Sequence, residues 1–354
     1  MLNQIVTVQG AKSIKYVQAA SPEQAGSRVA QIYTQVRRDD MLSPPIMLHA
    51  PAPDVLAGVW AMYRETLATG IVPRRYKEAV AAAVSTINEC PYCVDAHTMM
   101  LHGTNAHEAA QAIGNGRFDD IQDSKMHSLV AWAQATRTPN ADIINAPPFS
   151  AEEAPEIIGV AVTFHYINRM VHVFLDESPL PINLGSAQGL MKRMAGGMMK
   201  HLRRPPQPGD SLQFLPEADL PKDMGWAAGN ENVANAWAGV TAVMETAGRT
   251  SLSQTVRTLV QERLQTLQGE EMGMNRRWVD EAVAGLNEAD KPAGRLALLT
   301  AFASYQVGEK DIKVFRAQQP GDDRLIAATA WAGFAAARRI GCRLGYPFRS
   351  PQLK

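Results

Sequence analysis

Apolar residues recur at helical spacing along this chain, and the strict alternation typical of β-strands is sparse. Prolines, glycines and N-capping residues divide the pattern into segments of helical length. Ser21-Pro22-Glu23-Gln24 has the signature of a capping box and predicts the start of the first helix. Further helices are expected at residues 54–67, 79–87, 108–113, 124–135 and 152–175. The sequence therefore predicts an all-α protein.

Length and composition limit the classes of function. The 354 residues allow two domains or one duplicated unit, and an apolar fraction of 46% allows a sizeable core. Thirty-five acidic and 35 basic residues balance, which argues against a nucleic-acid or anionic-membrane ligand. Three cysteines are too few for the disulfide framework of a secreted protein. Since neither a signal peptide nor an apolar run of about 18 residues is evident, we expect a cytoplasmic protein with no membrane span.

A proline-rich stretch divides the chain into two similar halves. Met244-Glu245-Thr246 repeats Arg64-Glu65-Thr66, and residues 296–305 and 324–344 resemble residues 126–135 and 156–174. The alternative is that Ala-rich helices resemble one another without duplication. The predicted organisation is an N-terminal helical extension (1–47), a first unit (48–200), a linker (201–222) and a degenerate second unit (223–354).

Two cysteines lie at a spacing that favours redox chemistry. Two residues separate Cys90 from Cys93, which lets a disulfide close with little strain. Pro91 fits the first turn of a helix, so Cys90 is the expected N-cap. Unpaired N–H groups and the positive end of the helix dipole lower the pKa of either thiol there. His97 follows Cys93 by four residues on the same helical face, where it can accept the thiol proton.

Glu78 precedes the cysteines on a helix whose other residues are mostly Ala and Val. A carboxylate on such a surface either extends into solvent or is buried with a partner. Beside His97 it can orient the imidazole or pass on a proton.

An ungapped alignment of the two units puts other residue types at the four motif positions, which would leave the second unit chemically silent. These residues are Thr258, Glu270, Gly273 and Arg277.

Three other interpretations of the cysteine pair fit the sequence less well. Plain core cysteines would not require a proline between them and a histidine one turn later. A zinc site with His97 and either His102 or His107 would crowd one segment, whereas structural zinc usually takes two separated ligand pairs. A thioredoxin motif follows a β-strand, and none is predicted here. Cys342 has no partner nearby in the sequence and is expected to be structural.

Polar residues also lie on the apolar helix expected at 152–175. They are His165, Tyr166, Asn168, Arg169 and His172. We expect them to satisfy one another by hydrogen bonding, with the lining of a pocket as the alternative.

The pattern Glu-x₁₁-Cys-x-x-Cys-x-x-x-His, filled by Glu78, Cys90, Cys93 and His97, resembles the alkylhydroperoxidase D (AhpD) branch of the carboxymuconolactone decarboxylase superfamily. The resemblance covers residues 48–175 and, more faintly, the second half. It implies an all-helical fold around a two-helix hairpin, assembly into homo-oligomers, and peroxide reduction by a dithiol–disulfide cycle. In that cycle Cys93 is the attacking thiol and Cys90 the resolving thiol. His97 and Glu78 form the proton relay.

The resemblance also implies partners. The substrate is a peroxide, the reductant is a thioredoxin-like or lipoyl-bearing dithiol, and no metal or other cofactor is needed. Tyr92 stands where some family members have a second histidine, and it cannot act as a base near neutral pH. The alternatives are a disulfide reductase or redox sensor with little peroxide turnover, a family member of other activity, and a non-catalytic helical scaffold. The decarboxylase branch does not rely on a cysteine pair, so the motif argues against that chemistry.

Overall fold

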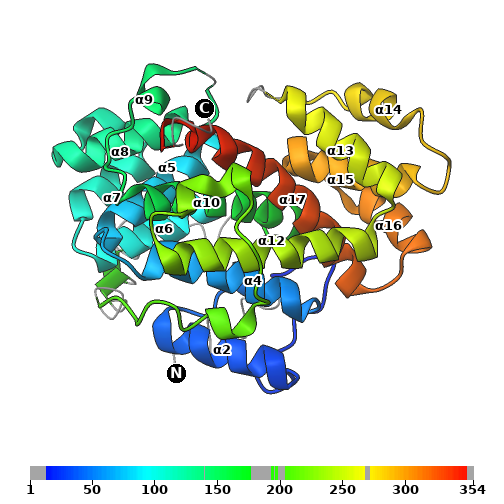
Figure 1. Ribbon diagram of the computed structural model, residues 1–354, viewed down its shortest axis with the longest axis horizontal. Coiled ribbons are helices and arrows are strands. Elements are labelled where there is room, and N and C mark those ends of the chain that lie inside the picture. Colours follow the sequence, from blue (N-terminus) through cyan, green and yellow to red (C-terminus); the bar gives the residue numbers. More distant parts are fainter. Residues whose placement is uncertain are drawn as a thin grey trace.

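Helices are the regular secondary structure of this protein in every part of the chain that the computed structural model describes (Figure 1). The structure describes residues 13–138, 140–176, 193–194, 196–197, 204–267 and 272–348. No β-strand occurs within these ranges. The all-α prediction is therefore confirmed.

The first half contains the helical hairpin that carries the cysteines. Its arms are α5 (Arg74–Ile87) and α6 (Pro91–Gly103), which pack against each other. Helices α8 (Ser124–Ala135) and α10 (Ala154–Phe174) also pack on α5. The other helical elements of this half are α2 (Ser27–Asp39), α3 (Pro44–Met47), α4 (Pro53–Tyr63), a π-helical turn (Arg64–Ala68), α7 (His107–Gly114), a 3-10 turn (Phe118–Asp120) and α9 (Asp142–Asn145).

The second half is built around two long helices, α12 (Glu231–Ser251) and α17 (Asp322–Leu344). Its other α-helices are α13 (Gln254–Thr266), α14 (Arg277–Val283), α15 (Lys291–Phe302) and α16 (Glu309–Gln318). Short 3-10 turns are formed by Leu212–Phe214, Lys222–Ala227, Ser304–Gln306 and Tyr346–Phe348. Of the residues aligned with the cysteine motif, Thr258 lies on α13, Gly273 in a loop and Arg277 at the start of α14, while Glu270 lies outside the described residues.

The first helix begins later than its sequence signals predict. Helix α2 starts at Ser27 with Gly26 as its N-cap, so the capping box expected at Ser21 is wrong. The reason is a local turn in which the carbonyl oxygen of Ser21 accepts a hydrogen bond from the backbone N–H of Gln24 at 3.0 Å. The chain has to leave this turn before it can enter the helix.

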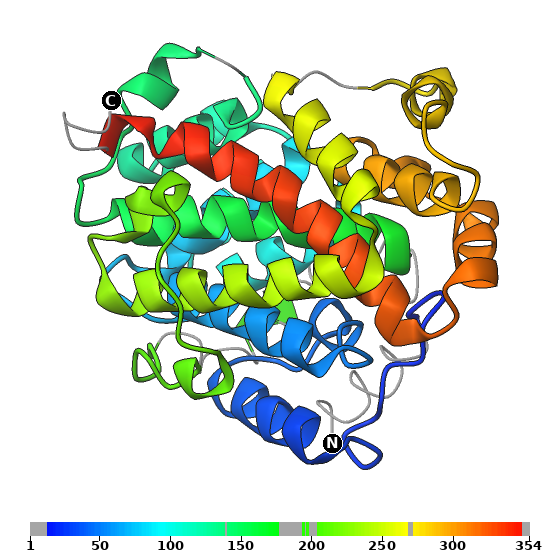
Figure 2. The same cartoon turned by 45° about the vertical axis from the view of Figure 1, so that its right-hand side comes forward.

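Helices that the sequence pairs as repeats pack against each other across the two halves. Helix α4 packs on α12, and α10 packs on α17 (Figure 2). The α10–α17 contact is so close that a Cβ atom added to Gly341 on α17 would lie only 2.7 Å from the side chain of Val162 on α10. A duplicated unit would produce such a pairing of equivalent helices, and the two-unit organisation remains a prediction.

Helix α10 lies at the centre of the molecule between the two halves (Figure 1). Among the described helices it is the one with the length and apolar composition of a membrane span. In the most apolar 18-residue stretch of this helix, 89% of the residues are buried inside the protein. Its apolar surface is therefore covered by the other helices.

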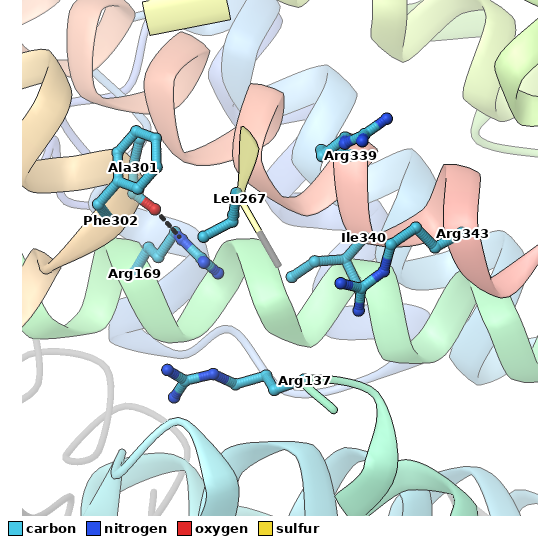
Figure 3. Close-up of a pocket in the computed structure, with 8 residues that line it drawn as sticks. All are labelled: Arg137, Arg169, Leu267, Ala301, Phe302, Arg339, Ile340 and Arg343. Atoms are coloured by element: carbon cyan, nitrogen blue, oxygen red, sulfur yellow. Dashed lines mark hydrogen bonds between the residues drawn. The ribbon is translucent and has the colours of Figure 1, made fainter. Parts of the chain in front are cut away.

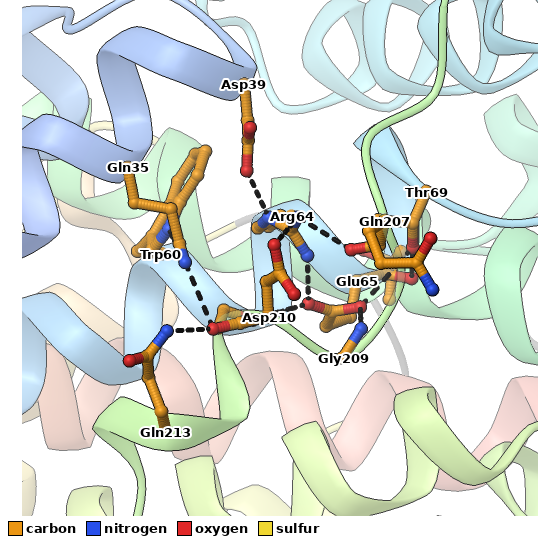
Figure 4. Close-up of polar contacts among 12 residues, drawn as sticks. Gln35, Asp39, Trp60, Arg64, Glu65, Thr69, Gln207, Gly209, Asp210 and Gln213 are labelled. Carbon is orange, nitrogen blue, oxygen red and sulfur yellow. Dashed lines mark hydrogen bonds and ion pairs between the residues drawn. The ribbon is translucent and has the colours of Figure 1, made fainter.

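A buried ion pair holds the proline-rich connection against the first half. Figure 4 shows Arg64 and Glu65, both fully buried, reaching this segment. The Arg64 guanidinium donates to the carbonyl of Gln207 at 2.7 Å. The Glu65 carboxylate accepts from the backbone N–H of Gly209 at 2.9 Å and from the hydroxyl of Ser211 at 2.6 Å. The described part of this connection contains the 3-10 turn Leu212–Phe214 but no α-helix or strand, and charge-assisted hydrogen bonds anchor it.

Candidate dithiol site

The cysteines lie at the tip of the α5–α6 hairpin. Glu89 adopts a left-handed conformation, with φ of 54°, which turns the chain sharply between the two helices. Cys90 is the N-cap of α6 and Pro91 occupies its first turn, as the sequence predicts. The backbone N–H of Cys90 donates to the carbonyl of Ser85 at 2.9 Å, which joins the two arms of the hairpin. The cysteines are therefore held at a helix N-terminus by a short, well-defined turn.

The two sulfur atoms are in direct contact. The Cys90 and Cys93 Sγ atoms lie 2.7 Å apart as free thiols. Their residues are only 1% and 2% exposed. Tyr92 between them is also buried, and this burial together with charge on the sulfurs raises the pKa of its phenol, which stays neutral. Cys342, in contrast, is half-buried on α17 and forms no disulfide.

Hydrogen bonding gives the two thiols different acidities. Burial alone would raise the pKa of Cys90, but hydrogen bonds from Cys93 and His172 outweigh it and lower that pKa to about 6. Burial and the neighbouring Cys90 raise the pKa of Cys93 well above its ordinary value, although Asn168 and Ser85 act in the opposite direction. Of the two thiols, Cys90 is therefore the one that ionises more readily, with Cys93 as its hydrogen-bonding partner.

His172, near the end of α10, connects the thiol pair to the second half. Its Nε2 atom lies 3.1 Å from the carbonyl oxygen of Glu89, and its Nδ1 atom lies 2.9 Å from the hydroxyl of Ser304. A carbonyl oxygen can only accept, so Nε2 carries a hydrogen, while the Ser304 hydroxyl, which can donate or accept, bonds to Nδ1. A residue of the second half thus fixes the imidazole that hydrogen-bonds to Cys90.

We expect alkylation of Cys90 in the reduced protein to show a midpoint near pH 6, because its pKa is lowered to about 6. The H172L variant removes a hydrogen bond to the thiolate and should shift this midpoint upward. Peptide mass spectrometry after iodoacetamide pulses between about pH 5 and 9 measures both values. The matched control is H127L, at a partly exposed histidine on α8. A wild-type midpoint near the ordinary thiol value of about 8.5 would contradict the assignment.

Glu78 and His97 form a second contact, as expected from their spacing. The Glu78 Oε2 atom lies 2.6 Å from Nδ1 of His97, and Oε1 accepts from Nε of Arg74 at 2.5 Å. Arg74 also donates to Asp40 at 2.8 Å. Burial disfavours the charged form of Glu78, but Arg74 and His97 outweigh it and hold the pKa of this carboxyl below its ordinary value.

The ionised Glu78 fixes the state of His97. Because the carboxylate accepts, Nδ1 of His97 donates to it, and Nε2 points away from this contact. Phe164 packs edge-on against the imidazole at 4.3 Å between ring centroids. Neither cysteine sulfur is hydrogen-bonded to His97 in the described structure. The four motif residues are therefore brought together as two pairs, Cys90 with Cys93 and Glu78 with His97.

The other histidines named from the sequence lie apart from the sulfurs. His102 and His107 contact each other through their Nδ1 atoms at 2.9 Å. Buried His165 hydrogen-bonds to Asn88 at 3.1 Å and to Thr136 at 2.9 Å. The partners of His165 lie at the ends of α5 and α8 and not on α10, while Asn168, Arg169 and His172 line a pocket, which is the alternative that the sequence left open. No group of three or more metal-ligating side chains gathers among the described residues.

A pocket opens beside the thiol pair between the two halves. Its lining from the first half is Asn88, Glu89, Arg137, Asn168, Arg169 and His172, and from the second half Met272, Phe302, Ser304 and Tyr305. Sequence reasoning missed the contribution of Ser85, Asn168, His172 and Ser304 to the site. The polar residues on an apolar helix were a signal, but their contact with the thiols depends on how α10 packs.

The fold and the site define an all-α protein with a buried dithiol on a helical hairpin. Residues 53–135 match the carboxymuconolactone decarboxylase family. The chain is also 39% identical, over 337 residues, to the alkyl hydroperoxide reductase Rv2159c of Mycobacterium tuberculosis, covering 94% of this chain and 96% of that protein. The chain therefore belongs to the carboxymuconolactone decarboxylase family, in its AhpD-like branch. The similarity extends through the second half, which has no cysteine motif.

Proposed function

We propose that this protein reduces peroxides through a Cys90/Cys93 dithiol–disulfide cycle. The observation that carries the proposal is the direct contact of two buried thiols, one of which is acidified at a helix N-terminus. The similarity to a protein named alkyl hydroperoxide reductase supports it.

The proposed cycle has three steps. A thiolate attacks the peroxide O–O bond, giving a sulfenic acid, and the leaving alkoxide takes a proton to become an alcohol. The second thiol condenses with the sulfenic acid, which forms the disulfide and releases water. An external dithiol then reduces the disulfide and becomes a disulfide itself. His97, oriented by Glu78, is proposed to move the proton.

Two observations bear on which sulfur attacks. The family pattern and the four-residue spacing to His97 assign attack to Cys93. The hydrogen bonds in the reduced protein favour ionisation of Cys90, with Cys93 as the proton donor. Serine variants of the two cysteines distinguish these assignments.

Burial of the sulfurs bears on the partners. A small peroxide can enter a narrow pocket, whereas a folded protein needs exposed sulfur for thiol–disulfide exchange. The 1% and 2% exposure of Cys90 and Cys93 thus favours peroxide over a protein disulfide as substrate. By the same reasoning, a slender lipoyl arm is a better reductant than the surface of a thioredoxin. Assembly into a homo-oligomer in the cytoplasm is also part of the proposal.

Thiol titration tests the proposed function. Addition of one equivalent of an alkyl hydroperoxide to the native protein should remove two thiols per chain, and a dithiol should restore both. If the protein is a catalyst, it should also sustain the oxidation of an excess of added dithiol by an excess of peroxide. If the thiols oxidise but turnover stays at the uncatalysed rate, the protein is a redox sensor and the peroxidase proposal fails.

A further inference from the structure

The contact between Glu78 and His97 is one end of a longer chain of buried polar side chains. Arg74 lies one turn before Glu78 on α5 and donates to its Oε1 atom at 2.5 Å. The same guanidinium donates through Nη2 to Oδ2 of Asp40 at 2.8 Å. Asp40 is 2% exposed, Glu78 is fully buried, and the Arg74 side chain is 8% exposed. These three residues and His97 therefore form one connected group, which we call the relay cluster.

Asp40 comes from a part of the chain that the cysteine motif does not include. It is the C-cap of α2, and it precedes the segment 53–135 that matches the family. Tyr63, at the end of α4, supports the contact, because its hydroxyl donates to Oδ2 of Asp40 at 3.2 Å and accepts from Arg74 at 3.3 Å. The N-terminal extension is thus joined to α4 and α5 at the relay cluster.

The hydrogen bonds of Arg74 restrain how the Glu78 carboxylate is turned. One carboxylate oxygen accepts from Nε of Arg74, and the other, Oε2, accepts from Nδ1 of His97 at 2.6 Å. A guanidinium is planar and its donors lie at fixed angles, so an anchored Arg74 holds the plane of the carboxylate that it contacts. The arginine side chain has several rotatable bonds, and Asp40 supplies the anchor at its far end.

The charges of the relay cluster favour proton uptake by His97. Burial acts against the charged form of Arg74, but Glu78 and Asp40 outweigh it and raise the pKa of this guanidinium well above its ordinary value. The cluster then contains one cation and two carboxylates. A proton taken up by His97 gives it equal numbers of positive and negative charges, which lowers the cost of burying them. Without the charge of Asp40, the protonated cluster would carry a surplus positive charge.

We propose that Asp40 and Arg74 are positioning residues of the proton relay: Asp40 holds the Arg74 guanidinium, which orients Glu78 and, through it, His97. This inference rests on the proposed peroxidase function, in which His97 moves the proton. It makes the N-terminal extension part of the active site, although Asp40 is not among the described residues that line the pocket beside the dithiol.

The D40N variant tests the role of Asp40 in catalysis. The amide keeps the size of the side chain and an oxygen acceptor but removes the charge that anchors Arg74. The rate constant for oxidation of the dithiol by an alkyl hydroperoxide, measured by thiol titration after rapid quenching, should fall about 10- to 100-fold, as expected when a relay group is misplaced. The matched control is D39N, since Asp39 is the neighbouring carboxylate and pairs with buried Arg64 at 2.7 Å (Figure 4). D39N should lose stability in urea unfolding and keep the wild-type rate.

A double-mutant cycle separates positioning from a structural role. If Asp40 acts through Glu78, D40N should slow oxidation in the wild-type background and have no further effect in E78Q. If D40N does not fold, Y63F provides the same comparison, because it keeps every charge of the relay cluster. Its expected loss in the wild-type background is about threefold, for one neutral hydrogen bond. Equal relative losses in both backgrounds would overturn the inference.

An NMR experiment tests the positioning without any turnover. A proton held between Nδ1 of His97 and the Glu78 carboxylate should give a resonance far downfield, which is assigned by its absence from H97N. This signal should persist in D39N and should broaden or disappear in D40N. An unchanged signal in D40N would overturn the inference, whether or not the rate falls. A signal that depends on Asp40 in a protein without peroxide turnover would support the positioning of His97 and refute only the proposed function.

Discussion

Replacement of either active-site cysteine by serine is expected to lower peroxide turnover by about 10³-fold or more, because a hydroxyl cannot complete the disulfide. Serine keeps the size and a hydrogen-bond donor, so C93S and C90S should both fold. The two variants differ in their intermediate. If Cys93 attacks, C90S accumulates a sulfenic acid that dimedone traps and C93S does not. If Cys90 attacks, as its low pKa favours, the pattern is reversed.

The C342S variant is the matched control for the cysteine replacements. Cys342 is half-buried on α17 and does not line the pocket beside the dithiol. Its replacement should leave turnover and dimedone labelling unchanged. Sustained catalytic turnover by C90S or C93S would show that peroxide reduction does not need the disulfide, and the proposed cycle would then be wrong.

The E78Q variant is expected to lower turnover by about 10²- to 10⁴-fold, the usual contribution of a general acid–base group. The neutral amide can no longer give His97 the charge-assisted hydrogen bond that the Glu78 carboxylate provides. The change also removes one of two carboxylates that pair with buried Arg74, so the free energy of unfolding should fall by about 3 kcal/mol. The pKa of Glu78 is lowered in the folded state, so its stabilising contribution is present at neutral pH. That contribution is lost as the pH falls through this lowered value.

The E156Q variant separates the effect of a lost buried carboxylate on stability from its effect on peroxide turnover. Glu156 is a fully buried carboxylate that pairs with Lys77 at 2.8 Å and accepts from two backbone N–H groups, without contact to the thiol site. This variant should lose comparable stability in urea unfolding but retain turnover at a temperature where it is folded. Full activity of folded E78Q would remove Glu78 and His97 from the proposed proton relay.

Local features of the fold and site could be predicted because they depend on neighbouring residues. The helix at Ser124–Ala135 and the N-cap at Cys90 follow from apolar spacing, proline placement and capping. The Glu78–His97 contact follows once two helices form a hairpin. The same local reasoning is wrong at Ser21, where a turn competes with the helix start.

Features that join distant segments could not be predicted. Ser304 lies 132 residues from His172, yet its hydroxyl hydrogen-bonds to the imidazole and helps to hold it beside Cys90. The gathering of Arg137, Arg169 and Arg339 around one pocket (Figure 3) likewise needs α17 packed on α10, because these residues come from three separate segments. A sequence pattern gives spacing along one helix, and it does not specify which helix of the other half will cover it.

The central position of α10 has a consequence for how this chain can evolve. The second half can change its surface and its loops freely, because the proposed chemistry requires no thiols there. It cannot be deleted, since its loss would expose the face of α10 that α17 covers and would remove Ser304 and Ala301, the partners of His172 and Arg169. Selection should therefore tolerate drift in the outer helices of the second half while it opposes any truncation, and shortened forms of this protein should be rare among its relatives.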